Sequence, residues 1–188
     1  MKKIMFNDKC GLTQAVLEGR KTQTRRIIPS DFFSLNWDIR EDTLVYENEW
    51  GDFLDVRNTK YSKYKVGEIV AVAQSYNSFY NDECNPNLFP NGAGWTNKRY
   101  VKPELMPHRI RITAVSVERL RDISDIDCMS EGINYYEQEG FSWCSTGKLF
   151  DTPREAYASL IDKISGKGTW ESNPWCFVYD FELVKKWE

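Results

Sequence analysis

The segment 19–26, GRKTQTRR, holds four cations and two hydroxyl groups in eight consecutive residues. Arginine and lysine side chains bind phosphate oxygens, so one interpretation is a phosphate-binding edge without catalysis. A lysine that is buried beside arginines has a lowered pKa and can act as a base. If Lys21 is such a base, the hydroxyl of a nearby threonine can be its nucleophile. The segment therefore predicts either phosphate binding or nucleophilic chemistry.

Backbone geometry limits which of these side chains meet. In an extended segment successive side chains point to opposite faces, so Lys21 and Thr24 lie on opposite sides of a regular strand. A turn at Thr22 and Gln23 would bring the two together, whereas a regular strand through Thr24 would keep them apart. The local path of the chain therefore decides between the two chemistries.

Regular elements are expected on both sides of this segment. Apolar residues at helical spacing predict a short helix at 10–18, which Gly19 ends, and a run that is apolar on both faces predicts a buried strand at 69–73. The alternation of the strand 108–120 changes phase once, which is typical of a β-bulge or a barrel corner. Further elements are a helix at 125–130, a helix that Thr152 and Glu155 begin with a capping box, and a closing strand at 176–184.

Three longer segments separate these elements. Residues 30–64 contain a predicted hairpin of strands 43–46 and 53–56, and residues 77–107 and 133–150 are irregular insertions. Several strands with few helices do not match the regular alternation of a Rossmann-type fold. We expect a single α+β domain over 1–188, in which a small closed mixed β-barrel is flanked by short helices and loop insertions.

Composition narrows the class of protein. With 41% hydrophobic and 14% aromatic residues the chain can bury a core, so disorder as the main state is excluded. The net charge of −3 conceals an excess of five positive charges in residues 1–28 and the same excess in 97–121, whereas 38–55 is acidic. Positive patches of this kind are either solvated faces or phosphate sites, and they suit a small nucleotide or a single flipped base better than a long duplex.

Several other classes of site and location are not expected. No run of about 18 apolar residues is present and the start of the chain soon becomes polar, so we expect a cytoplasmic protein without a membrane span. The five cysteines form no Cys-x-x-Cys pair and His108 is the single histidine, so neither a metal nor a cofactor is expected. His108 is a weak candidate for a catalytic base.

The pattern Gly19-x-Lys21-x-x-x-x-Arg26 resembles the signature of ASCH domains, a branch of the PUA-like β-barrel superfamily. Three further segments resemble the family in the same order: Val66-Gly67-Glu68, Ser130-Glu131-Gly132 and the aromatic segment 173–179. The similar parts make up roughly half the chain. The three insertions exceed the minimal domain and resemble those of longer bacterial and phage ASCH proteins.

The resemblance implies a cleft that holds RNA or a nucleotide. The motif residues expected to bind such a ligand are Gly19, Arg20, Lys21, Thr22, Arg25 and Arg26. Some small ASCH proteins are amidohydrolases that deacetylate N4-acetylcytidine, and the positions that match their lysine, threonine and glutamate are Lys21, Thr24 and Glu131. A third hypothesis is a phage or mobile-element interaction protein whose insertions bind a partner. Four aromatic residues are candidates either for stacking on a base or for packing: Tyr76, Trp95, Tyr100 and Trp143.

Overall fold

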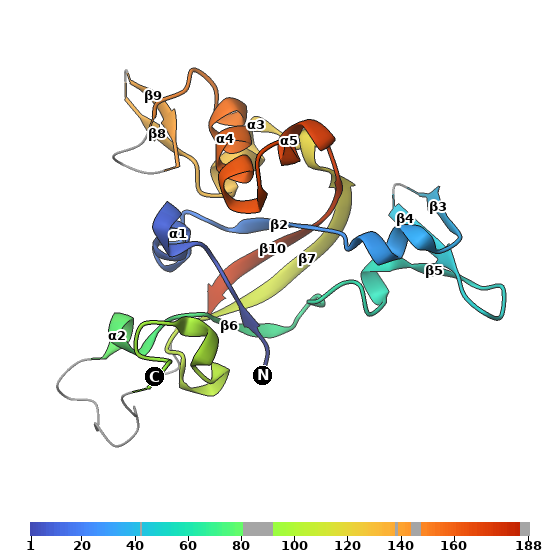
Figure 1. Ribbon diagram of the computed structural model, residues 1–188, viewed down its shortest axis with the longest axis horizontal. Coiled ribbons are helices and arrows are strands. Elements are labelled where there is room, and N and C mark those ends of the chain that lie inside the picture. Colours follow the sequence, from blue (N-terminus) through green and yellow to red (C-terminus); the bar gives the residue numbers. More distant parts are fainter. Residues whose placement is uncertain (42, 81–91, 138, 144–147, 185–188) are drawn as a thin grey trace.

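A five-stranded sheet forms the centre of the computed structural model, which describes residues 1–41, 43–80, 92–137, 139–143 and 148–184 (Figure 1). The strand order is β1-β6-β7-β10-β2, and only β1 and β6 are parallel. The bounds are β1 (Lys3–Ile4), β6 (Ile69–Val72), β7 (Arg109–Arg119), β10 (Trp175–Val184) and β2 (Gln23–Ile27). With its flanking helices, this sheet makes the chain an α+β protein, as the sequence predicted.

The described strands do not close into the predicted barrel. Their ladder is open, with β1 at one edge and β2 at the other. β1 is only two residues long, so it offers little backbone for pairing on a second side. A side chain links the two edges instead, because Arg26 of β2 donates a 2.7 Å hydrogen bond to the carbonyl of Met5, directly after β1.

The long strand β7 carries the expected bulge. Asp180 of β10 pairs with Ala114 and the next residue, Phe181, pairs with Ile112, which leaves Thr113 as the extra residue. An extra residue on one strand bends it and increases its twist. The change of phase in the sequence is therefore explained by a bulge within one position of the predicted place.

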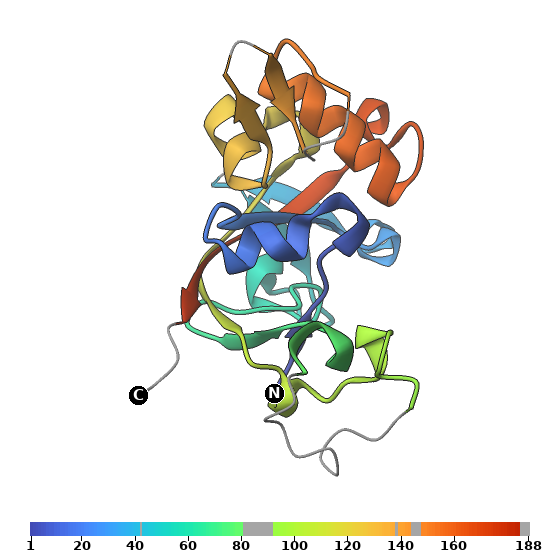
Figure 2. The same cartoon turned by 90° about the vertical axis from the view of Figure 1, so that its left-hand side faces the viewer.

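Most helices gather at one end of the sheet. Figures 1 and 2 show α3 (Asp125–Ser130), α4 (Pro153–Ser165) and α5 (Thr169–Ser172) together there, and α1 (Leu12–Leu17) beside β2. The predicted capping box is present, since the Thr152 hydroxyl accepts from the Glu155 amide and the Glu155 carboxylate accepts from the Thr152 amide. None of the helices in the described part of the chain is long and apolar enough to cross a bilayer.

The insertions add small elements at the periphery. The predicted hairpin is present, because β4 (Thr43–Glu47) pairs with β5 (Phe53–Asp55), and an additional strand, β3 (Trp37–Arg40), pairs with β4 to make a three-stranded meander. β8 (Asn134–Tyr136) and β9 (Gly140–Ser142) form a hairpin near α4. α2 (Tyr76–Phe79) and residues 92–107 lie at the opposite end, and 81–91 and 144–147 are outside the described residues. Short 3-10 helices complete the chain: Asp8–Cys10, Ser30–Ser34, Val56–Asn58, Lys98–Tyr100, Pro103–Leu105 and Leu120–Asp122.

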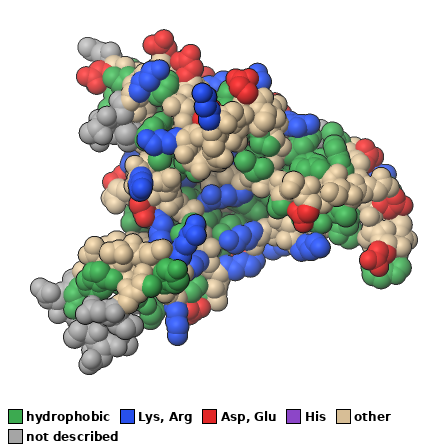
Figure 3. Space-filling view, in the orientation of Figure 1, with side chains coloured by type: hydrophobic (Ala, Val, Ile, Leu, Met, Phe, Trp, Pro, Cys, Tyr) green, Lys and Arg blue, Asp and Glu red, His purple; other side chains and the backbone are tan. Residues whose placement is uncertain are grey.

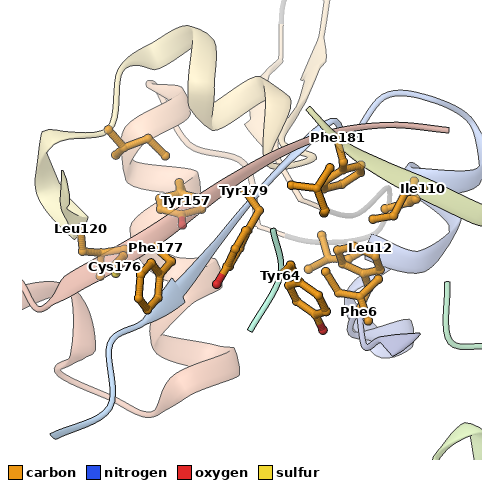
Figure 4. Close-up of a cluster of buried hydrophobic side chains, with 14 of the residues drawn as sticks. Phe6, Leu12, Tyr64, Ile110, Leu120, Tyr157, Cys176, Phe177, Tyr179 and Phe181 are labelled. Atoms are coloured by element: carbon orange, nitrogen blue, oxygen red, sulfur yellow. The ribbon is translucent and has the colours of Figure 1, made fainter. Parts of the chain in front are cut away.

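The main core lies on the concave side of the sheet and is rich in aromatic side chains. Figure 4 shows Tyr179 and Phe177 of β10 close to Tyr64, and the Tyr64 and Tyr179 ring centroids are 5.2 Å apart. Leu12 and Phe6 cover the same side from α1 and from the chain before it. Edge-to-face aromatic pairs and buried apolar area stabilise this wall, which also supports β2.

Candidate functional site

The turn between α1 and β2 fixes the position of Lys21. Gly19 has a φ of 74°, a left-handed conformation that glycine adopts without steric cost, and it ends the helix. The amides of Arg20 and Lys21 then both donate to the carbonyl of Ala15, at 2.9 and 3.0 Å. The left-handed turn therefore explains why the motif has a glycine at this position. The turn places Lys21 next to the last turn of α1.

The end of α3 brings Glu131 to the same place. Glu131 is the C-cap residue of α3, and the amide of Thr22 donates to the carbonyl of Ser130 at 2.9 Å, which fastens the two segments together. Gly132 has a φ of 102°, and a Cβ there would lie 3.6 Å from the Cβ of Lys21. Glycine thus permits both the turn and the close approach.

Lys21 and Glu131 form a buried ion pair. Their side chains are 1% and 5% exposed, and the lysine Nζ lies 2.5 Å from Glu131 Oε2. The same ammonium donates to the carbonyls of Glu131 and Gln23, at 2.7 and 2.8 Å. These three bonds use all three N–H groups of the ammonium.

The pair also covers the free edge of β2. The amide of Phe181 donates to the carbonyl of Thr22, and the amide of Ile28 donates to the carbonyl of Trp175. The backbone N–H and C=O groups of the even-numbered residues of β2 therefore bond to β10, and those of the odd-numbered residues point to the free edge. On that outer edge the Arg25 amide donates to Glu131 Oε1 at 2.6 Å, and the Gln23 carbonyl accepts from Lys21. The two side chains replace the neighbouring strand that an edge lacks.

Arg25 belongs to the same buried cluster. Its side chain is 1% exposed and contacts Glu118 at 2.7 Å, Glu131 at 3.2 Å and Asp127 at 3.6 Å. Burial lowers the pKa of Arg25, but these carboxylates outweigh it and raise the pKa above its usual value. With Lys21, the cluster holds two cations and three carboxylates, so it carries no excess positive charge for a ligand.

For Lys21, unlike Arg25, the pKa is lowered overall. Desolvation in this closed site lowers the pKa of the Lys21 ammonium below its ordinary value, although the neighbouring Glu131 carboxylate opposes the change. Arg25 and Arg26 lower it further by repulsion between like charges. A lowered pKa is the property that a lysine base requires, as the sequence suggested.

A pocket of about 310 Å³, the motif pocket, opens over this cluster. Thr24 and Arg26 of β2 line it together with Lys21 and Glu131. Other walls come from α4, from the segment after β1 and from Arg99 of the insertion 77–107, which is exposed. Figure 3 shows lysine and arginine side chains around a hollow between α3–α5 and residues 92–107. The motif pocket is thus a cleft with both polar and apolar walls and a basic rim.

Lys21 and Thr24 form no hydrogen bond with each other within the described residues, as expected for a regular strand through Thr24. β2 begins at Gln23, so Lys21 lies just before this strand. The regular strand does include Thr24, and both side chains still line the motif pocket. Within the described residues the Thr24 hydroxyl has no hydrogen-bond partner, and Lys21 donates elsewhere.

The structure brings together some of the predicted site residues and separates others. Lys21, Thr24, Arg25, Arg26 and Glu131 line the motif pocket. Gly19, Arg20 and Thr22 are exposed outside its lining, and Arg20 instead bonds to Glu18 and Asn134. Arg25 is enclosed by carboxylates, so its charge is neutralised by ion pairs within the protein.

Arg99 and Tyr157 are two of the lining residues that were not predicted as site residues. Arg99 reaches the motif pocket from an insertion, and only its place in a basic stretch of sequence pointed to it. Tyr157 of α4 is buried, and within the described residues its hydroxyl has no hydrogen-bond partner. Burial raises the pKa of Tyr157 well above its usual value, so it stays a neutral donor. The four candidate stacking residues lie outside the described lining: Tyr76, Trp95, Tyr100 and Trp143.

Comparison with known proteins identifies no similar protein. No protein-family model matches the chain, and no match is found among curated proteins or among solved structures. The choice of a function therefore depends on the residues of the motif pocket.

Proposed function

We propose that the motif pocket binds a nucleotide or a single nucleotide of RNA, and that its phosphate lies between Arg26 and Arg99. The observation that carries the proposal is that both arginines line the pocket while neither forms an ion pair within the described residues. Lys21 and Arg25, in contrast, are already neutralised. An anion entering the pocket is therefore attracted chiefly by the two rim arginines.

Arg26 is well placed for this role. Its Nη2 donates to the Met5 carbonyl at 2.7 Å, and its guanidinium lies 5.8 Å from the centre of the Phe6 ring. These contacts hold the side chain and leave other N–H groups for a ligand, because a guanidinium has five. A held guanidinium loses little entropy when it binds phosphate.

The proposed function agrees with the resemblance to ASCH domains. Lys21, Arg26 and Glu131, which carry that resemblance, occupy one pocket although they lie up to 110 residues apart in sequence. We propose that the chain is a long ASCH-like domain whose sheet remains open. The shared pocket supports this proposal without depending on a barrel.

A titration of nucleosides against nucleoside 5′-monophosphates tests the binding function. Cytidine 5′-monophosphate is expected to bind at least tenfold tighter than cytidine, and its affinity falls as salt rises because phosphate contacts release counterions. Arg99→Gln is expected to weaken monophosphate binding about tenfold. Arg20→Gln, a motif arginine outside the pocket, is the matched control and leaves binding unchanged. Equal affinities for nucleoside and monophosphate would contradict the proposal.

Hydrolysis of an acylated nucleoside is the second candidate function. It is favoured by one observation: Thr24, with its free hydroxyl, shares the pocket with a lysine of lowered pKa and a carboxylate. In this reaction neutral Lys21 takes the Thr24 proton as the hydroxyl oxygen bonds to the acetyl carbon. The bond to the leaving amine then breaks as that amine takes a proton, and water releases the acetyl group as acetate. Lys21 must first exchange its present hydrogen bonds for one to Thr24.

Mass spectrometry of N4-acetylcytidine incubated with the protein tests this second function. The expected result is release of cytidine by the wild type and no release by Thr24→Ala, because the nucleophile is lost. Thr22→Ala is the matched control, since that threonine is exposed and lies outside the pocket. Equal turnover by Thr24→Ala and wild type would exclude Thr24 as the nucleophile.

A further inference from the structure

A second pocket of about 290 Å³, the aromatic pocket, adjoins the motif pocket. The two share Met5 and Arg26 in their linings, so the Arg26 side chain stands between them. Of the ligand-binding and catalytic residues that the resemblance implies, only Arg26 lines this second pocket. It therefore offers binding space that the proposed function does not use.

Aromatic residues form much of the wall of the aromatic pocket. Tyr61 is half-buried, whereas Tyr64, Phe177 and Tyr179 are buried behind the pocket surface. Phe177 and Tyr179 come from β10, and Tyr61 and Tyr64 come from the chain before β6. Figure 4 shows Phe177, Tyr179 and Tyr64 side by side in this region. The Tyr64 hydroxyl donates to the Lys3 carbonyl, and the Tyr179 hydroxyl accepts from the Lys63 amide, so these polar ends are already bonded. The pocket is thus suited to a flat ring rather than to a polar chain.

A second cation stands at this pocket. Lys63 is exposed and lines it, and within the described residues its ammonium forms no ion pair. Its nearest aromatic contact is the Tyr64 ring, whose centre lies 5.5 Å away. Together with Arg26, Lys63 gives the aromatic pocket a positive border. Such a border attracts a ligand that carries an anionic group as well as a ring.

We infer that the two pockets bind two consecutive nucleotides of a single strand, with the linking phosphate at Arg26. This inference rests on the proposed nucleotide-binding function and names its ligand class. Each pocket lies at or near the lower limit for a ligand site, so each fits one nucleotide better than two. One base stacks on the half-buried ring of Tyr61, with Tyr64 and Phe177 as the apolar floor behind it, and the neighbouring nucleotide occupies the motif pocket.

The test compares two probes that carry the same number of phosphates. Cytidine 3′,5′-bisphosphate has one base, and the 5′-phosphorylated dinucleotide pCpC has two. The dinucleotide is expected to bind at least tenfold tighter, because base stacking on aromatic side chains contributes to affinity without a new phosphate. Equal dissociation constants for the two probes would overturn the inference.

Variants of the aromatic pocket test whether this pocket causes the tighter binding of pCpC. Tyr61→Leu keeps an apolar side chain beside Phe32 but removes a stacking face, and it is expected to abolish most of the gain for pCpC. Lys63→Gln changes an exposed residue and is expected to weaken pCpC at least threefold, with the bisphosphate unaffected. Lys102→Gln, which changes an exposed lysine outside the lining of both pockets, is the matched control. Equal losses for the bisphosphate and pCpC would overturn the inference.

The outcomes distinguish failure of the two-pocket inference from failure of the proposed nucleotide binding. If the bisphosphate binds in an Arg99-dependent manner but pCpC binds no tighter, the two-pocket inference fails and nucleotide binding stands. If neither probe binds, nucleotide binding fails and the inference fails with it. If pCpC binds tighter and only the aromatic-pocket variants reduce the difference, both are supported.

Discussion

Glu131→Gln is expected to lower the free energy of unfolding by roughly 3–5 kcal/mol, the usual cost of breaking a buried ion pair by removing one partner. The amide cannot balance the ammonium of Lys21 or the guanidinium of Arg25, which are both 1% exposed. It can still accept from the Arg25 amide, so the loss measures charge more than hydrogen bonding. Chemical denaturation of the variant and the wild type gives the value.

The pH dependence of this loss identifies its cause. Burial lowers the pKa of Lys21, and removing Glu131 removes the attraction that opposes the change, so the pKa falls further. Between that folded value and the ordinary value of 10.5 the unfolded chain binds a proton that the folded chain does not, so stability rises with pH. The deficit of Glu131→Gln should therefore shrink as the pH approaches 10.5.

Two controls complete the measurement. Lys21→Met in the Glu131→Gln background is expected to recover part of the loss, because it removes an unpaired buried cation. Glu118→Gln changes a carboxylate that is 27% exposed and contacts only the guanidinium of Arg25, so a smaller loss is expected. A loss below 1 kcal/mol for Glu131→Gln would show that the buried pair contributes no net charge stabilisation.

Arg26→Gln is expected to weaken pCpC binding roughly tenfold to a hundredfold, because a hydrogen bond to a charged group contributes about 1.5–3 kcal/mol. Arg26 lines both pockets, so its loss should affect the mononucleotide and the dinucleotide alike. The dependence of affinity on salt should become shallower, since one phosphate contact is removed. Titration at two or more salt concentrations measures both effects.

Substitution by lysine separates charge from geometry. Arg26→Lys keeps the positive charge but loses the planar fork, so an intermediate affinity is expected. Because Arg26 also bonds to the Met5 carbonyl, unfolding curves of both variants are needed beside the titrations. Unchanged affinity in a folded Arg26→Gln would place the phosphate elsewhere.

Local signals in the sequence predicted most of the elements that hold the site. The capping box of Thr152 and Glu155, the phase change in β7 and the end of α1 at Gly19 all depend on neighbouring residues, and the structure confirms each. The placement of Lys21 beside Glu131 was reached through the family resemblance, because no local pattern joins residues 110 positions apart.

Features that depend on distant packing were missed. The third strand of the meander, Trp37–Arg40, is exposed along its length and has no buried alternation to reveal it. Barrel closure was wrong for the described strands, because it depends on how far the two-residue strand β1 extends. Arg99 reaches the pocket only through the path of an insertion.

The hypothesis of an interaction protein stays a prediction. The meander exposes apolar side chains, with Trp50 at 82% and Ile39 at 53%, as that hypothesis expects. It also expects a filled motif cleft, whereas the motif pocket is open. The open pocket therefore favours a ligand at the motif over a purely structural role for the sheet.

The parallel pair at the sheet edge links pocket assembly to folding order. Lys3 pairs with Ala71, and Met5, directly after β1, lines both pockets, while the next residue, Phe6, lines the motif pocket. Pairings of large sequence separation carry a high loop-closure entropy and raise contact order, which slows folding. The antiparallel pair β7–β10 joins segments that are also distant, but it gains ten register positions against two for β1. We therefore expect β1 to dock after β7 and β10 have paired, so that ligand competence is acquired after the rest of the sheet has formed.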